Sequence, residues 1–253
     1  MIVAMFQYPI KGFTPQLVAK AILSPGEAFP GDRLMAVEDG PCGFDPAAPV
    51  HIAKSRFTVL ARSAAVAKVR TDYGLTTGIL TAHAPGSPPF EASLAQSSAR
   101  LAFVDWLTTC LAHLSDGAFA GPLRLVDGDG HRFLDHPRGH VSILNLASVR
   151  DLETRIGAPV DPARFRANIH VEGWPAWVEN GWKDRTLDLG AVRARIFAPI
   201  TRCAATRANP VSGESDIDIP AALHRLYGHI LCGVYAHIEG PGEVSVGDVA
   251  QVL

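Results

Sequence analysis

The chain has 253 residues, a formal net charge of −2 and a hydrophobic content of 47%. A balanced charge with a pI near 6.5 provides no basic face for a polyanion, so the composition argues against a nucleic-acid partner. No apolar run approaches the ~20 residues that a membrane helix needs. We therefore expect no membrane partner either.

The cysteines are sparse and follow neither a metal-binding nor a disulfide pattern. They are Cys42, Cys110, Cys203 and Cys232. The first residues carry no basic region of the kind that begins a signal peptide. These features predict a cytoplasmic protein whose thiols are reduced.

The first part of the chain is expected to be rich in strands. The opening apolar residues and residues 34–37 are strand-like, and Pro-Gly pairs at 25–26 and 30–31 predict turns between them. Between residues 93 and 117, apolar side chains recur at helical spacing and Gly117 supplies a stop. Cys110 lies on the repeating face, so it is predicted to be a core residue.

Residues 123–140 combine glycine, aspartate and histidine. Their Asp-Gly-Asp-Gly run at 127–130 is typical of a turn between strands. An EF-hand loop would need further ligands and a distal Glu. Four other side chains could form a zinc or iron cluster, although such residues also fill ordinary polar loops: His131, Asp135, His136 and His140.

The C-terminal half alternates strands with short helices. Residues 141–144 predict a strand, and residues 147–156 predict a helix closed by Gly157. The alternation over 192–198 predicts a half-buried strand, and residues 220–227 predict a helix that ends at Gly228. Residues 234–238 and 249–253 predict closing strands. Without a regular βαβ rhythm, these elements favour an α+β fold, mainly β and built on a barrel.

Cys203 follows Arg202 at the expected end of the strand over 192–198. A thiolate is a soft ligand for a transition metal, and a neighbouring guanidinium favours the ionised sulfur and can bind a phosphate bidentately. A single cysteine is more often a small buried hydrophobe. The pair alone therefore marks only a candidate site.

Several segments resemble the MOSC family, the domain at the C-terminal end of molybdenum cofactor sulfurases that also occurs in the amidoxime-reducing component and in bacterial MOSC proteins. They are Phe165-Arg166-Ala167-Asn168-Ile169, Thr201-Arg202-Cys203 and Val246-Gly247-Asp248, with Tyr8-Pro9-Ile10-Lys11 and Gly31-Asp32-Arg33 as N-terminal elements. The resemblance implies a MOSC-type β-barrel at 138–253. Residues 1–137 would form an N-terminal-like region whose first strands pack with that barrel.

The resemblance also implies a site for molybdenum cofactor, a pterin whose dithiolene binds the metal and whose other end carries a phosphate. Cys203 would be the thiolate on molybdenum, and Arg202 and Tyr235 complete the predicted catalytic set. The predicted cofactor contacts are Lys11, Arg33, Arg166, Asn168, Thr201 and Arg202. Asn209 stands where relatives often carry Asp, and Gly12 stands where they often carry Ser, so contacts there are expected to differ.

Two enzymatic functions and one non-catalytic function are consistent with this site. The favoured one is an oxidoreductase that reduces N-hydroxylated or related small molecules. Because the chain has no cysteine spacing for an iron–sulfur cluster, a separate ferredoxin-like or haem protein would supply electrons. The alternatives are a sulfurtransferase that carries sulfur as a Cys203 persulfide received from a cysteine desulfurase, and a molybdopterin carrier without catalysis.

Overall fold

The structure is a computed structural model that describes residues 1–114, 119–136 and 140–253. Within those ranges it contains fifteen strands and three α-helices, which confirms the predicted α+β fold of mainly β character. None of the helices in the described ranges combines the length and apolarity that crossing a membrane requires. The sequence boundary drawn at 137/138 lies outside the described residues and stays a prediction.

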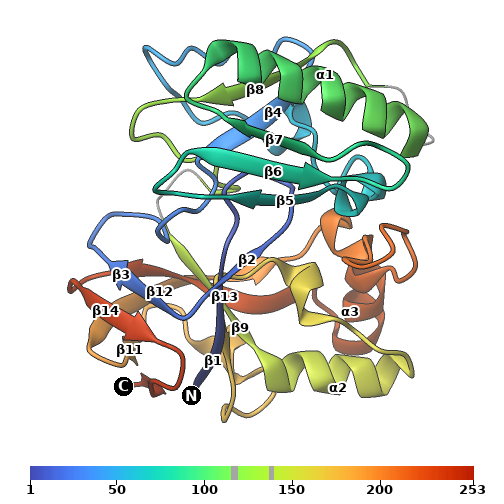
Figure 1. Cartoon of the computed structure of the whole chain (residues 1–253). Helices are drawn as coiled ribbons and strands as arrows, with labels where there is room; N and C mark the ends of the chain where they lie inside the picture. Colours follow the sequence, from blue (N-terminus) through green and yellow to red (C-terminus); the bar gives the residue numbers. More distant parts are fainter. Residues whose placement is uncertain (115–118, 137–139) are drawn as a thin grey trace.

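The largest sheet has eight strands and curls through the lower half of the molecule in Figure 1. Its order is β15 (Ala250–Val252), β11 (Thr186–Leu189), β12 (Val192–Thr201), β13 (Leu231–Ile238), β9 (Val141–Asn145), β10 (Ile169–Val171), β1 (Ile2–Gln7) and β2 (Gln16–Val18). Strands from the N-terminus therefore share a sheet with strands from the C-terminal half. A short ribbon beside it pairs β3 (Lys20–Leu23) with β14 (Gly242–Ser245).

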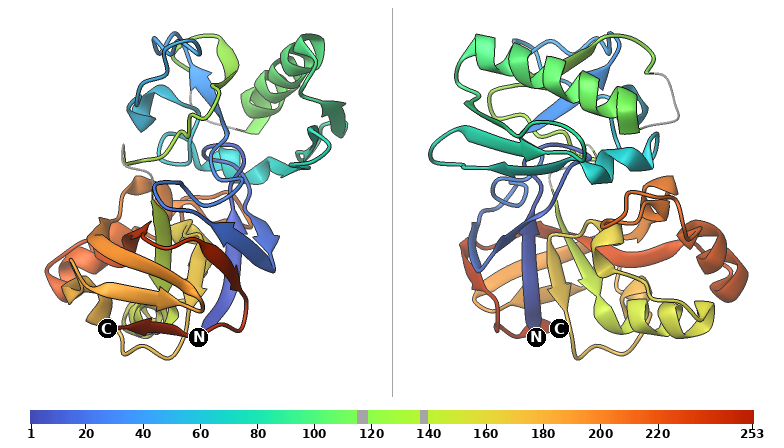
Figure 2. Two further views of the ribbon diagram at one scale, coloured as in Figure 1. Left: turned by 90° about the vertical axis from the view of Figure 1, so that its left-hand side faces the viewer. Right: turned by 45° about the vertical axis from the view of Figure 1, so that its right-hand side comes forward.

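A second lobe lies above this sheet in Figure 1 and is separate from it in both views of Figure 2. It pairs β4 (Met35–Asp39) with β8 (Leu123–Asp127), and it holds the sheet of β5 (Arg70–Tyr73), β6 (Ile79–His83) and β7 (Phe90–Ser93). The long helix α1 (Ser97–Leu114) covers these strands. Two hydrophobic clusters, one in each lobe, show that each lobe has its own core.

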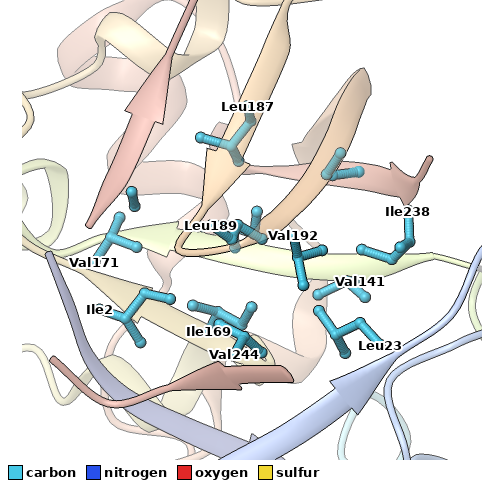
Figure 3. Close-up of a cluster of buried hydrophobic side chains, with 14 of the residues drawn as sticks. Ile2, Leu23, Val141, Ile169, Val171, Leu187, Leu189, Val192, Ile238 and Val244 are labelled. Carbon is cyan, nitrogen blue, oxygen red and sulfur yellow. The ribbon is translucent and has the colours of Figure 1, made fainter. Parts of the chain in front are cut away.

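The lower core is built from inward-facing side chains of the large sheet and of β3 and β14 (Figure 3). On β12, Val192, Ala194 and Ile196 are fully buried while Arg193 and Arg195 are exposed, which confirms the predicted alternation as far as Ile196. Ala198 is only half-buried, and the pairing with β13 shifts register between Ile196 and Ala198. Each fully buried Val or Ile contributes roughly 1.5–3 kcal/mol relative to an exposed one. This core holds β12 rigidly, and β12 leads directly to Cys203.

The three predicted helices form, with differences at their ends. Helix α1 begins at Ser97 rather than near residue 93, because Ser93 belongs to β7. Gly117, its expected stop, lies outside the described residues, but Cys110 is buried as predicted. Helices α2 (Leu146–Ile156) and α3 (Ile219–Tyr227) end at Gly157 and Gly228, which adopt the predicted left-handed C-cap with φ of 76° and 73°.

His170 on β10 makes stability depend on pH. Its side chain is buried, and its Nε2 has no hydrogen-bond partner among the described residues. Burial, with a smaller effect of Arg202, lowers the pKa of His170 to about 4. The unfolded chain binds this proton near pH 6.5, so stability is unaffected above that pH and falls as the pH drops from 6.5 toward 4.

We expect His170→Phe to remove this part of the pH dependence. Relative to wild type, the free energy of unfolding of the variant should rise by about 2 kcal/mol between pH 7.5 and pH 5, because 1.36 kcal/mol corresponds to each pH unit of differential protonation. Urea titrations of both proteins at the two pH values measure this difference. A difference that stays constant with pH would show that His170 does not resist protonation.

Candidate functional site

A cavity of about 390 Å³ lies between the two lobes, at the end of β12. Its volume is typical of a small-molecule site. Seven of the eight predicted site residues line it: Lys11, Arg33, Arg166, Thr201, Arg202, Cys203 and Tyr235. The structure thus brings together side chains that are far apart in the sequence.

Cys203 sits where β12 ends and a single 3-10 turn, η5 (Ala204–Arg207), begins. Its backbone carbonyl accepts hydrogen bonds from the N–H of Thr206 at 3.0 Å and from the Thr206 hydroxyl at 2.9 Å. The side chain is half-buried, and its Sγ lies 3.3 Å from Lys54 Nζ. Cys203 is therefore fixed through its backbone while its sulfur faces the cavity.

Arg202 is almost fully buried, and its side chain stabilises the segment around Cys203. Its guanidinium donates to the carbonyl of Cys232 through Nε at 2.8 Å and to the carbonyl of Phe165 through Nη1 at 2.7 Å. Gly233 makes this possible, since a Cβ there would lie 2.5 Å from the Ile143 carbonyl oxygen and 3.1 Å from Arg202 Nη2. Arg202 thus acts as a clamp that joins β13 to the segment before Arg166.

A chain of charges runs across the cavity to the cysteine. Lys11 Nζ, which is buried, donates to Asp135 Oδ1 at 2.5 Å and to the Phe133 carbonyl at 2.8 Å, while Lys54 Nζ lies 3.6 Å from Asp135 Oδ2. Burial alone would raise the pKa of Asp135, but Lys11 and Lys54 hold it well below its ordinary range. Burial likewise lowers the pKa of Lys54, but Asp135 and Cys203 raise it above its ordinary value.

Two arginines that line the cavity converge on Tyr8. The guanidinium carbons of Arg33 and Arg166 lie 4.9 Å and 4.4 Å from the centre of the Tyr8 ring. Arg33 also pairs with Asp32, whereas Arg166 Nη1 donates to the Phe13 carbonyl at 2.7 Å. Burial, with Arg33 nearby, lowers the pKa of Arg166 to about 10.

Both arginines are held in a strained backbone conformation. Arg33 and Arg166 have φ of 48° and 52°, in the left-handed region that non-glycine residues rarely adopt. Arg166 Nη2 is buried and has no hydrogen-bond partner among the described residues. Strain and an unpaired donor at one cavity wall are the kind of cost that proteins retain at binding sites.

Tyr235 on β13 also lines the cavity. Its ring centre lies 4.2 Å from that of His140 and 5.8 Å from that of Phe197. Burial raises the pKa of Tyr235, so its hydroxyl stays protonated at neutral pH. His140, which the sequence marked only as a possible metal ligand, also lines the cavity.

Asn168 is the one predicted cofactor contact that does not line the cavity. Its Oδ1 accepts from the Ser142 N–H at 3.1 Å and from the Ser142 hydroxyl at 2.7 Å, and its Nδ2 donates to the Phe6 carbonyl at 3.2 Å. These bonds use its polar atoms to join β9 to β1. In this structure Asn168 therefore holds the wall of the cavity rather than facing into it.

The two departures from the family pattern have structural reasons. Gly12 has φ of 90°, and a Cβ there would lie 2.9 Å from the Thr58 carbonyl oxygen, so serine would not fit. Asn209 donates through Nδ2 to Asp216 at 2.7 Å, and Asp216 also pairs with the buried Arg164. An aspartate at position 209 would place two carboxylates against each other.

The alternative metal cluster finds no support in the part of the chain that the structure describes. No three His, Cys, Asp or Glu side chains there converge on a metal position. His131 packs against the rings of Phe44 and Phe133, and Asp135 binds two lysines. Cys232 is fully buried, and burial raises its pKa to about 12, as befits a core thiol.

Sequence reasoning missed Lys54 and Arg164, and it read Asp135 only as a possible metal ligand. Lys54 lies 149 positions before Cys203 in a segment that the family motifs do not cover, so no spacing could indicate the contact. Arg164 stands two residues before Arg166, and that repetition was the one available signal. Both residues line the cavity.

Asp135→Asn should destabilise the fold through Lys11. The asparagine oxygen can still accept from Lys11, but the change removes the negative charge that compensates the buried Lys11 ammonium, which should lower the free energy of unfolding by about 2 kcal/mol. Adding Lys11→Met should restore much of the loss, because no unpaired charge is then left. Urea unfolding of both variants measures this coupling. Lys20→Met, which breaks an exposed pair with Glu243, is the control, and an equal loss there would contradict the assignment.

The comparisons with known proteins point to one domain family. Residues 130–251 match the family model described as MOSC domain. Among curated relatives, the mouse (Mus musculus) mitochondrial amidoxime-reducing component 1 is 30% identical over 123 residues, 44% of this chain and 36% of that protein. The molybdenum cofactor sulfurase of Drosophila ananassae is 29% identical over 163 residues, 58% of this chain and 20% of that protein. The match thus spans about a third or less of each relative.

Among solved structures, the YuaD protein from Bacillus subtilis aligns over 100% of this chain and 96% of that chain. The TM-score is 0.44 and the sequence identity is 12%.

Proposed function

Residues 130–251 of the chain match the MOSC domain family, and on this basis we propose that the protein binds molybdenum cofactor in the cavity and reduces N-hydroxylated or related small molecules there. The main support for the proposal is that the half-buried Cys203 thiol and several cationic side chains line the same cavity. A soft ligand and cationic clamps are what a metal dithiolene and its phosphate require. The similarity to the amidoxime-reducing components supports the same function.

The residues present suit this group. Arg166 Nη2 is a buried donor without a partner among the described residues, and an unpaired buried donor costs about 1–3 kcal/mol until an acceptor arrives. An anionic ligand would supply that acceptor. The cavity is also rich in positive charge while its described lining contains one carboxylate, Asp135.

Each residue then has a separate task. Cys203 would hold the molybdenum, and Lys11, Arg33 and Arg166 would bind the pterin and its phosphate. Arg202 would position Cys203 rather than bind the cofactor directly, because its guanidinium donates hydrogen bonds to backbone carbonyls.

The remaining predicted residues complete the cavity and its wall. Thr201 precedes the Arg202–Cys203 pair and lines the cavity, and Asn168 holds the wall. The Tyr235 hydroxyl, kept protonated by burial, would donate a hydrogen bond to a substrate oxygen.

When bound, the cofactor supplies two-electron chemistry that the side chains alone do not have. Overall, an N-hydroxylated substrate takes up two electrons and two protons, its N–O bond breaks, and the reduced nitrogen compound and water leave. The electrons would come from a separate ferredoxin-like or haem protein. The cytoplasmic location predicted from the cysteine content remains a prediction.

The test is turnover of an aryl amidoxime by the protein purified from a host that makes molybdenum cofactor, with a chemically reduced donor. The proposal expects two electrons consumed for each amidine formed. Protein that contains the cofactor but forms no amidine with any N-hydroxylated compound would contradict it.

Sulfur transfer is the second candidate. The match to a molybdenum cofactor sulfurase and the half-buried Cys203 beside Lys54 favour it, since a thiol that accepts sulfur must be reachable. Incubation with a cysteine desulfurase and cysteine should then add one sulfur to Cys203, as read by mass spectrometry. A protein that binds pterin but shows neither turnover nor persulfide would be a molybdopterin carrier.

Arg166→Ala should separate cofactor retention from chemistry. Losing a charged hydrogen-bond donor of about 1.5–3 kcal/mol should lower bound cofactor by about tenfold or more at limiting supply, while turnover per bound molybdenum falls less. Molybdenum content and turnover are measured on the same samples. Arg195→Ala, which removes an exposed pair with Glu239, is the matched control. Normal retention with lost turnover would contradict the role of Arg166.

A further inference from the structure

The cations of the cavity are unequally exposed. The lining contains Lys11, Arg33, Lys54, Arg164, Arg166 and Arg202. The exposed fraction of the side chain is 4% for Lys11, 14% for Arg33 and 2% for Arg164, but it is 41% for Lys54. Lys54 is therefore far more accessible to a small molecule entering the cavity than these three cations are.

Among the described residues Lys54 makes one hydrogen bond in the charge chain, to the Cys203 sulfur, whereas Lys11 makes two to oxygen atoms. Its Nζ lies 3.6 Å from Asp135 Oδ2, beyond hydrogen-bond distance, and 3.3 Å from Cys203 Sγ. Asp135 depends less on Lys54, because Lys11 donates to its other oxygen at 2.5 Å. Lys54 can thus change partner without leaving the Asp135 carboxylate unpaired.

We propose that Lys54 is a specificity-determining residue that binds an oxyanion of the substrate, such as a carboxylate, which takes the place of Asp135 as its partner. The inference rests on the proposed function and extends it from N-hydroxylated compounds in general to those that carry an acidic group. A carboxylate offers two oxygens to an ammonium at closer range than the present 3.6 Å. The excess of cations over acids in the lining favours such an anion.

The position of Lys54 indicates the substrate rather than the cofactor as the source of this oxyanion. Lys54 lies beside Cys203, where the metal end of the cofactor would be. The phosphate is at the opposite end of that molecule, and its proposed contacts include Arg33 and Arg166, which gather around Tyr8. An acidic group that reaches Lys54 therefore belongs to a molecule positioned at the reacting end.

The experiment compares an aryl amidoxime with the same compound carrying a para-carboxylate. We expect Lys54→Met to lower the ratio of kcat/KM for the carboxylated compound to kcat/KM for the neutral one by about 10-fold or more, as the loss of one charged hydrogen bond predicts. Lys54→Arg keeps the charge and should lower the ratio less. Lys20→Met removes an exposed lysine on β3 and should leave the ratio unchanged.

The outcomes separate this inference from the proposed function. Turnover of both compounds with an unchanged ratio in Lys54→Met overturns the role of Lys54 and leaves the function standing. Loss of pterin and molybdenum from Lys54→Met assigns the oxyanion to the cofactor and also overturns it. If wild type turns over neither compound, the function fails, and calorimetric titration with the carboxylated amidoxime decides on Lys54 alone. Equal Kd values in wild type and Lys54→Met, or no binding by wild type, then overturn the inference.

Discussion

Cys203→Ala should abolish molybdenum binding and reduce turnover of N-hydroxylated compounds to the background of the donor alone. The Cys203 side chain is half-buried just after β12. The hydrogen bonds that fix this turn are accepted by the Cys203 backbone carbonyl, which an alanine also has. The fold should therefore survive, with a loss of at most a few kcal/mol. Metal analysis, turnover and urea unfolding of one preparation measure the three quantities together.

Cys42→Ala is the matched control, since Cys42 is also a half-buried free thiol but contacts Glu38 and does not line the cavity. It should retain both metal and turnover. Pterin should remain on Cys203→Ala in part, because the cationic contacts are unchanged. Full molybdenum content in Cys203→Ala would show that the thiol is not the ligand.

Arg202→Met should cause the largest loss of stability among the cavity variants. The substitution leaves the carbonyls of Cys232 and Phe165 without their donor in a buried site. Unpaired buried acceptors of this kind, together with the loss of a fitted guanidinium, should cost about 3–5 kcal/mol. Urea titration reads the effect as a lower midpoint.

Arg202→Lys provides the sharper comparison. A lysine keeps the charge but lacks the planar fork that reaches two carbonyls at once, so it should recover only part of the loss. Because Arg202 precedes Cys203, both variants should also lose cofactor. If Arg202→Met lowered the free energy of unfolding by less than about 1 kcal/mol, the hydrogen bonds of Arg202 would not be what stabilises the segment around Cys203.

Much of the C-terminal half could be predicted because its signals are local. The alternation on β12 follows directly from one buried face, and Gly157 and Gly228 end their helices through a left-handed conformation that glycine adopts easily. The sheet of β5, β6 and β7 could not be predicted this way. Leu80 is its one large, fully buried apolar residue, and the other buried positions, Thr71 and Ala82, are too polar or too small to complete a hydrophobic alternation.

The site shows the same division between local and distant information. Arg166, Arg202 and Cys203 stand in short motifs, and the cavity brings them together. Lys54 approaches Cys203 only because the upper lobe packs over the end of β12, a contact without any trace in spacing. Asn168 is the opposite case. It stands in a family motif, but its side chain is hydrogen-bonded within the wall of the cavity instead of facing the interior.

The claim that the cavity holds molybdenum cofactor is tested most directly by the molybdenum and pterin content of the wild-type protein, measured per chain after purification from a host that makes the cofactor. The account predicts close to one molybdenum and one pterin for each chain. Protein that carries neither, although a known molybdenum enzyme expressed in the same cells is fully loaded, would contradict it.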